Sequence, residues 1–109
     1  MRNESNYFVK GENPKLLIHS GTHGDEYEVI ESVRKAVEKY HDFLPDFVFV
    51  PEVSPSAVGR KKRNNDVGVD VNRSFFDDSP IEEVRVNREI TKDYAPFDLC
   101  VTFHEEPVL

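Results

Sequence analysis

Three apolar runs of strand length, separated by segments that can form helices, constrain the fold of this chain more than any other feature. The runs are residues 16–19, 46–53 and 97–103. This alternation favours an α/β fold with a mostly parallel sheet flanked by helices and joined by right-handed crossovers. Because parallel strands end at one edge of the sheet, and ligands bind at that edge, side chains that follow the strands are the first candidates for a functional site.

Two helices are expected between these strands. Asp25 is the expected cap of the first helix, and apolar side chains three or four positions apart predict its buried face. That face consists of Val29, Ile30, Val33, Ala36, Val37 and Tyr40. The second helix is expected over residues 81–92, with Ser79 as its cap and Pro80 at its first position.

Three shorter features complete the expected organisation. Residues 7–9 form a short candidate strand, and residues 54–80 are expected to be mostly loop. Within that loop, valines alternate over residues 67–71 and could form a short strand. Cys100 lies in an apolar run, so we expect it in the core, where cysteine behaves as a small hydrophobic residue.

Composition excludes several classes of protein. The chain has 109 residues, enough for one domain, and a net charge of −7, which argues against a nucleic-acid binder. Its apolar runs are too short for a membrane helix, and its first residues do not resemble a signal peptide. A single cysteine cannot form an internal disulfide, so a cytoplasmic protein is expected. The oligomeric state is left open by these features.

The first candidate site follows the first strand, in His23-Gly24-Asp25-Glu26. A catalytic zinc ion takes three nitrogen or oxygen ligands from the protein and keeps one open position. His23 and Glu26 can supply two of them, and His104, at the end of the last strand, can supply the third. The spacing alone also fits a loop histidine beside an ordinary acidic residue in the first turn of a helix.

Basic residues provide a second set of candidates. Arg60-Lys61-Lys62-Arg63 is followed by Asn72-Arg73. Arginine binds a carboxylate through two hydrogen bonds, and near a metal it can stabilise an oxyanion. A solvated basic loop and a surface ion pair explain the same residues without a function.

The order of these motifs resembles the zinc carboxypeptidase superfamily, and most closely its succinylglutamate desuccinylase/aspartoacylase branch. The motifs are H-G-D-E, S-P-S-A, an arginine, D-V-N-R-S-F and a strand that ends in histidine, and they span roughly residues 16–106. The resemblance implies a zinc carboxypeptidase-like (phosphorylase/hydrolase-like) fold with zinc bound by His23, Glu26 and His104. It also implies that Asn72 and Arg73 bind the carboxylate of the substrate.

The arginine that polarises the substrate carbonyl falls in the basic run. Counting forward from Pro55 selects Arg63, whereas counting back from Asn72, as in digestive-type carboxypeptidases, selects Arg60. We favour Arg63. In place of the asparagine usual at the start of the N-P-x-A loop, this chain has Ser54.

Members of the family carry their catalytic glutamate well beyond the third metal ligand. Glu105 and Glu106 match no family position for that role, so we expect residues 1–109 to be a single domain that represents the N-terminal part of the fold and is truncated at its C-terminus. The implied activity is zinc-dependent hydrolysis of an amide bond next to a free carboxylate, in a small N-acyl-amino-acid substrate. The alternatives are a metallocarboxypeptidase acting on peptide C-termini and a non-catalytic metal-binding module.

Overall fold

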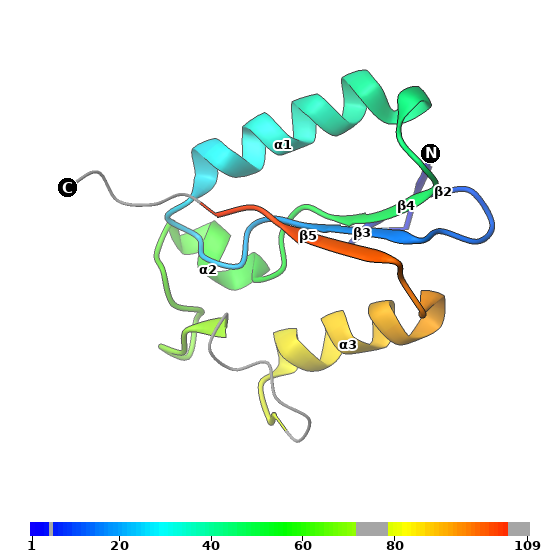
Figure 1. Cartoon of the computed structure of the whole chain (residues 1–109). Helices are drawn as coiled ribbons and strands as arrows, with labels where there is room; N and C mark the ends of the chain where they lie inside the picture. The colour runs from blue at the N-terminus through cyan, green and yellow to red at the C-terminus, as the bar shows by residue number, and fades with distance from the viewer. Residues whose placement is uncertain (5, 72–78, 105–109) are drawn as a thin grey trace.

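A five-stranded sheet with helices on both faces forms the framework of the protein (Figure 1). The computed structural model describes residues 1–4, 6–71 and 79–104. The strands are β1 (Arg2–Asn3), β2 (Phe8–Lys10), β3 (Leu16–His19), β4 (Phe47–Val50) and β5 (Leu99–Thr102). The helices are α1 (Tyr27–Tyr40), α2 (Pro55–Arg60) and α3 (Glu82–Tyr94), with a short 3₁₀ helix, η1 (His41–Phe43), after α1.

The strand order is β1-β2-β4-β3-β5, and the sheet is mixed. β3 pairs in parallel with both β4 and β5, whereas β2 pairs antiparallel with β1 and β4. The expected α/β fold is confirmed, and its three long strands are the parallel ones. Their carboxyl ends therefore lie side by side at one edge, next to the loops that follow β3 and β5.

Two apolar clusters, one on each face, hold the helices against the sheet. On one face Val33 and Val37 of α1 pack with Ile18, Phe47 and Phe49. On the other face Val84 and Ile90 of α3 pack in a cluster with Leu17, Val48 and Val50. Consecutive strand residues thus face opposite layers, which explains why β4 is apolar at every position.

Four local expectations were wrong. The cap of α1 is Glu26, not Asp25, and that of α3 is Ile81, not Ser79. Residues 55–60 form α2 where a loop was expected, and Val67 to Val71 form no strand. Six helical residues are too few to show a periodic apolar face, which is why sequence periodicity does not detect α2.

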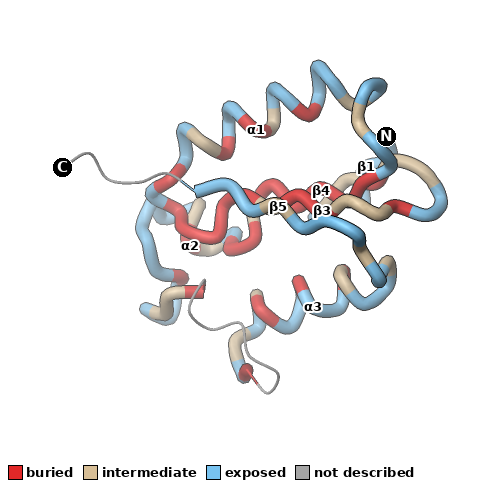
Figure 2. The backbone as a smooth tube through the Cα atoms, in the orientation of Figure 1, coloured by how far each residue is buried: buried red, intermediate tan, exposed pale blue. Residues whose placement is uncertain are grey.

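Cys100 is exposed, which contradicts its expected place in the core. The strand that carries it, β5, pairs with β3 on one side only among the described strands. As Figure 2 shows, β5 is therefore largely exposed, whereas β3 and β4 are largely buried. No helix among the described residues is long and apolar enough to cross a membrane.

Candidate metal centre

The loop between β3 and α1 is fixed by backbone contacts with the segment that follows β4. The N–H of Gly24 donates to the carbonyl of Lys62 at 2.8 Å, and the N–H of Ser54 donates to that of Gly21 at 2.9 Å. Gly21 has a φ of +68°, which favours glycine. At Gly24 a β-carbon would lie 1.8 Å from the carbonyl oxygen of Ala57 in α2, so no larger residue fits there.

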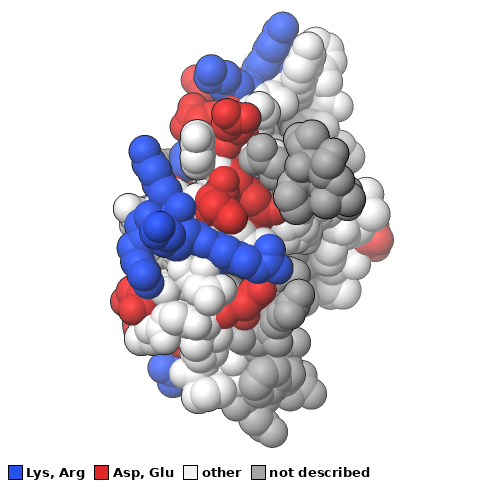
Figure 3. Space-filling view, turned by 90° about the vertical axis from the view of Figure 1, so that its left-hand side faces the viewer, with Lys and Arg blue, Asp and Glu red and all other residues white. Residues whose placement is uncertain are grey.

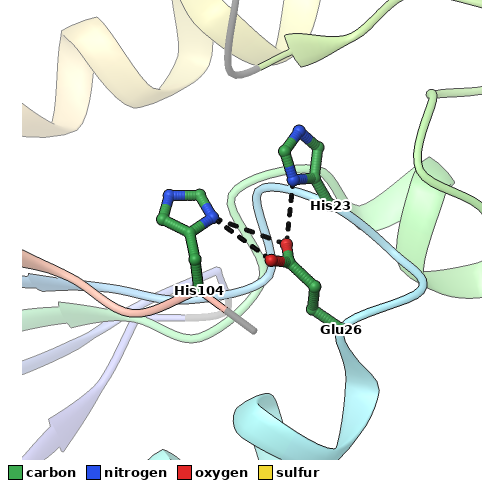
Figure 4. A group of neighbouring side chains, drawn as sticks. All are labelled: His23, Glu26 and His104. Atoms are coloured by element: carbon green, nitrogen blue, oxygen red, sulfur yellow. Dashed lines mark hydrogen bonds and ion pairs between the residues drawn. The ribbon is translucent and has the colours of Figure 1, made fainter. Parts of the chain in front are cut away.

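This loop brings His23 and Glu26 toward His104, which follows β5 (Figure 4). Nδ1 of His23 lies 2.9 Å from Oε2 of Glu26. Nδ1 of His104 lies 3.4 Å from Oε1 and 3.5 Å from Oε2 of the same carboxylate. One ligand atom from each residue lies within 4.8 Å of the other two, and the two imidazole centroids are 5.5 Å apart.

The burial of the three side chains differs in a way that suits a binding site. The side chains of His23 and Glu26 are 4% and 11% exposed, whereas that of His104 is 32% exposed. His23 and Glu26 therefore form a fixed inner wall, and the site opens toward solvent on the side of His104. His23, Glu26 and His104 thus lie close together, as the expected parallel arrangement of the strands predicted.

Asp70 holds the opposite side of the His23 ring. Its Oδ1 lies 2.8 Å from Nε2 of His23, and its Oδ2 accepts a hydrogen bond of 3.1 Å from Nε of Arg63. Burial alone would raise the pKa of Asp70, but the hydrogen bond and charge of His23 and the charge and hydrogen bond of Arg63 outweigh it and lower that pKa. Asp70 is therefore a carboxylate that orients the His23 ring through Nε2, while Nδ1 faces Glu26 and is the ring atom placed to act as a metal ligand.

The structure separates the two candidate arginines. Arg63 is connected to His23 through Asp70, whereas NH1 of Arg60 donates to the carbonyl of Asn65. On the face at the carboxyl ends of the parallel strands, Lys and Arg side chains form a band beside acidic ones (Figure 3). Arg63 is the candidate that the contacts connect to the site. Asn72, Arg73, Glu105 and Glu106 lie outside the described residues.

Zinc fits the donor set. Two imidazole nitrogens and one carboxylate are ligands that zinc binds, and three protein ligands leave a position open in a tetrahedral site. Asp70 adds the outer carboxylate that typically accompanies a metal-binding histidine. The buried His23 and Glu26 would supply two of the three ligands, and the more exposed His104 would supply the third.

Two parts of this arrangement were missed by the sequence prediction. Asp70 stands in the D-V-N-R motif but was given no function, although an acid after a valine run near candidate ligands is a signal for such a partner. The packing of α2 against Gly24 has no comparable signal, because it depends on a backbone contact between residues 33 positions apart.

A family model for the succinylglutamate desuccinylase/aspartoacylase catalytic domain matches residues 12–99 of the chain. No curated protein sequence matches at a significant level. The match covers most of the chain and includes His23, Glu26, Asp70 and both candidate arginines.

Two solved structures have a similar fold. An aspartoacylase family protein from Mesorhizobium loti superposes with a TM-score of 0.70 at 26% identity, over 90% of this chain and 33% of that one. A candidate metallopeptidase from Shewanella amazonensis gives a TM-score of 0.68 at 24% identity, over 89% of this chain and 41% of that one. The chain thus spans 33% of the length of the first structure and 41% of the second.

Proposed function

Because the chain belongs to the succinylglutamate desuccinylase/aspartoacylase catalytic-domain family, we propose that it forms the zinc-binding part of a hydrolase that cleaves an amide bond next to a free carboxylate. The substrate class is a small N-acyl-amino acid. The observation that carries this proposal is the set of donor atoms from His23, Glu26 and His104 within 4.8 Å of one another.

In this proposal His23, Glu26 and His104 hold the zinc ion. Bound zinc would polarise the scissile carbonyl and lower the pKa of water at the site toward about 7. Asp70 keeps the His23 ring in the orientation and tautomer that present Nδ1 to the metal.

The basic side chains bind the negative charges of the reaction. We assign oxyanion stabilisation to Arg63, because it is held beside the site by Asp70. Asn72 and Arg73 are assigned to the carboxylate of the substrate, on the basis of the motif they occupy. An arginine fork and an amide donor suit a planar carboxylate.

The general base is assigned to none of the described residues. Glu26 is used as a ligand and Asp70 as the partner of His23. A base that accepts a proton from water and transfers it to the leaving nitrogen contributes about 10²–10⁴ in rate. The 109-residue chain alone is therefore expected to bind zinc and to hydrolyse amides poorly.

The metallocarboxypeptidase alternative is supported by the similar fold of the Shewanella amazonensis protein. The two enzymes differ in what lies on the acyl side of the scissile bond: a small acyl group or a peptide. Hydrolysis of short peptides in preference to N-acyl-amino acids would support the carboxypeptidase.

A first experiment tests the metal site without depending on turnover. The purified protein is stripped with a chelator, and zinc binding is measured for the wild type, Glu26→Gln and Glu28→Gln. Glu28 lies in the first turn of the same helix and is exposed, so its variant has the same change of charge without loss of a proposed ligand. We expect one zinc per chain in the wild type and in Glu28→Gln, and much weaker binding in Glu26→Gln. Equal binding by all three would refute the site.

A second experiment tests the reaction. N-acyl-amino acids and short peptides are assayed with the zinc-loaded chain and with a relative that contains the complete catalytic domain as a positive control. Slow hydrolysis of N-acyl-amino acids that is lost in Glu26→Gln supports the proposal. Zinc binding without any hydrolysis supports the non-catalytic module instead.

A further inference from the structure

The segment that carries Arg63 and Asp70 has no regular secondary structure. Residues 61–70, which follow α2, form turns and bends rather than a helix or a strand. Asp70 is nevertheless held at 2.8 Å from Nε2 of His23 and at 3.1 Å from Nε of Arg63. Contacts with neighbouring elements must fix this segment, because it has no regular backbone hydrogen bonding of its own.

Asn65 closes the segment into a tight turn. The residue is 2% exposed, and its Oδ1 accepts the N–H groups of Val67 at 3.1 Å and Val69 at 2.9 Å. Its own N–H donates to the carbonyl of Val69 at 2.8 Å, and its carbonyl accepts the N–H of Gly68 at 3.0 Å. Asparagine side chains stabilise turns through local bonds of this kind. The position of the turn therefore determines where Asp70, the next residue, lies.

Ser56 attaches this turn to α2. Its Oγ accepts the N–H of Asp66, the second residue of the turn, at 3.1 Å. The same hydroxyl donates to Oε1 of Glu83 in α3 at 3.0 Å. A serine hydroxyl has one proton to donate, and the contact with Glu83 uses it, so a lone pair stays directed at the turn. Glu83 thus orients the hydroxyl that binds the turn.

Glu83 also caps α2. Ser54 stands at the N-cap of α2 without capping it, because its Oγ donates to Oε1 of Glu83 at 3.0 Å. Oε2 of Glu83 accepts the N–H of Ser56 at 3.1 Å, one of the donors that the first turn of a helix leaves without a partner in the helix. A carboxylate from another helix therefore replaces the usual cap. That helix, α3, is itself fixed on the sheet by Val84 and Ile90.

We propose that Glu83 is a positioning residue of the metal centre, which acts by holding Ser56 and the turn at residues 65–69 so that Asp70 meets His23. The inference rests on the proposed function, in which His23 binds zinc. Loss of the Glu83 carboxylate removes three hydrogen bonds from the start of α2. The turn then gains freedom, so the contact between Asp70 and His23 is less preorganised when metal binds.

The first test measures zinc affinity by competition with a chelator at constant pH. Glu83→Gln keeps the size of the side chain but removes its charge and one acceptor oxygen. Glu82→Gln is the matched control, because Glu82 lies in the same first turn of α3 and is exposed. We expect Glu83→Gln to bind zinc up to about 10-fold more weakly, the lower end of the range for loss of an outer carboxylate, and Glu82→Gln to bind it like the wild type.

A double-mutant cycle with Asp70 separates positioning from a general loss of stability. Asp70→Ala removes the side chain through which Glu83 is proposed to act. In that background Glu83→Gln should cause little further loss of zinc affinity, whereas the effects of independent residues would multiply. Urea denaturation of each variant verifies that folded proteins are compared. If Glu83→Gln does not fold, Ser56→Ala replaces it in the cycle.

Nuclear magnetic resonance of the zinc-free protein tests the same connection without metal. The chemical shifts of Nδ1 and Nε2 of His23 report the tautomer of the ring and its contact with Asp70. Ser56→Ala removes the bridging hydroxyl but keeps the backbone N–H that binds Glu83, whereas Ser56→Thr keeps both. We expect the ring shifts to change in Glu83→Gln and Ser56→Ala, in the direction seen in Asp70→Ala, and Ser56→Thr to restore them.

Three results would overturn the proposal. One is wild-type zinc affinity in Glu83→Gln, and another is an equal loss of affinity with and without the Asp70 side chain. The third is a set of His23 ring shifts that changes in neither Glu83→Gln nor Ser56→Ala. A wild-type protein that binds no zinc would refute the proposed function instead, and the zinc-free spectra would still decide whether Glu83 positions Asp70 against His23.

Discussion

Replacement of Asp70 by asparagine is the most informative perturbation of the site. Asp70 is neither a proposed zinc ligand nor a residue assigned to substrate binding. It acts through His23, whose Nε2 lies 2.8 Å from its Oδ1. Asp70→Asn keeps the size of the side chain and can still accept a hydrogen bond, but it removes the negative charge that faces the ring.

The expected magnitude follows from these contacts. Loss of the outer carboxylate behind a metal-binding histidine typically weakens metal binding about 10–100-fold. Because each factor of ten corresponds to about 1.4 kcal/mol, the expected loss is roughly 1.4–2.8 kcal/mol. The amide retains part of the interaction with the ring, and Arg63 loses its ionic partner, so we expect a value near the middle of this range.

Zinc affinity is measured by competition with a chromogenic chelator at constant pH. Asp66→Asn is the matched control, because Asp66 lies in the same segment, is exposed and changes charge by the same amount. Asp70→Asn should bind zinc at least about 10-fold more weakly than the control. If both variants bind zinc with the affinity of the wild type, Asp70 does not position His23 and the structural reasoning fails.

Three further predictions follow from individual residues. Gly24→Ala should lower the unfolding free energy by roughly 1–3 kcal/mol in urea denaturation, because the new β-carbon would meet the Ala57 carbonyl at 1.8 Å; an unchanged midpoint contradicts this contact. Burial lowers the pKa of His19 from 6.5 to about 4, so between these pH values the unfolded chain binds a proton that the folded chain does not. The free energy of unfolding should therefore fall by up to about 3 kcal/mol as the pH is lowered from 6.5 to 4. His19→Leu should flatten this pH dependence, and an equally steep profile in that variant would exclude His19 as its source. In a catalytically complete version, Arg73→Ala should cost roughly 2–4 kcal/mol in kcat/KM for carboxylate substrates, and an unchanged value removes Arg73 from substrate binding.

Elements with a strong periodic signal could be predicted from the sequence. β3 is apolar at its first three positions, and α1 shows a repeated apolar face, so both were found close to their true bounds. Parallel pairing of the long strands then implied that the loops after β3 and β5 meet. This reasoning brought His23 and His104 together across 81 positions of sequence, and their rings lie 5.5 Å apart.

Features that depend on the neighbours of an element could not be predicted in the same way. Cys100 lies in an apolar run that reads as core, but burial of a strand requires a partner on each side, and β5 has β3 alone among the described strands. The choice between Arg60 and Arg63 likewise depended on where each side chain points, because Arg60 is the last residue of α2 and Arg63 follows that helix. Counting positions could not decide it, whereas the contact of Arg63 with Asp70 favours Arg63.

The contacts of the loop after β3 indicate how metal binding and folding would be coupled in this protein. Before any metal binds, that loop is already tied to β4 and its continuation, since Ser20 donates to Val50 and accepts from Val53. His23 and Glu26 are therefore preorganised by the most buried part of the sheet, whereas His104 follows the exposed strand β5. A metal ion bound by all three would join the exposed strand to the buried one, and its binding energy would stabilise β5. Metal binding would thus add a constraint to a strand that, among the described strands, pairs with β3 alone.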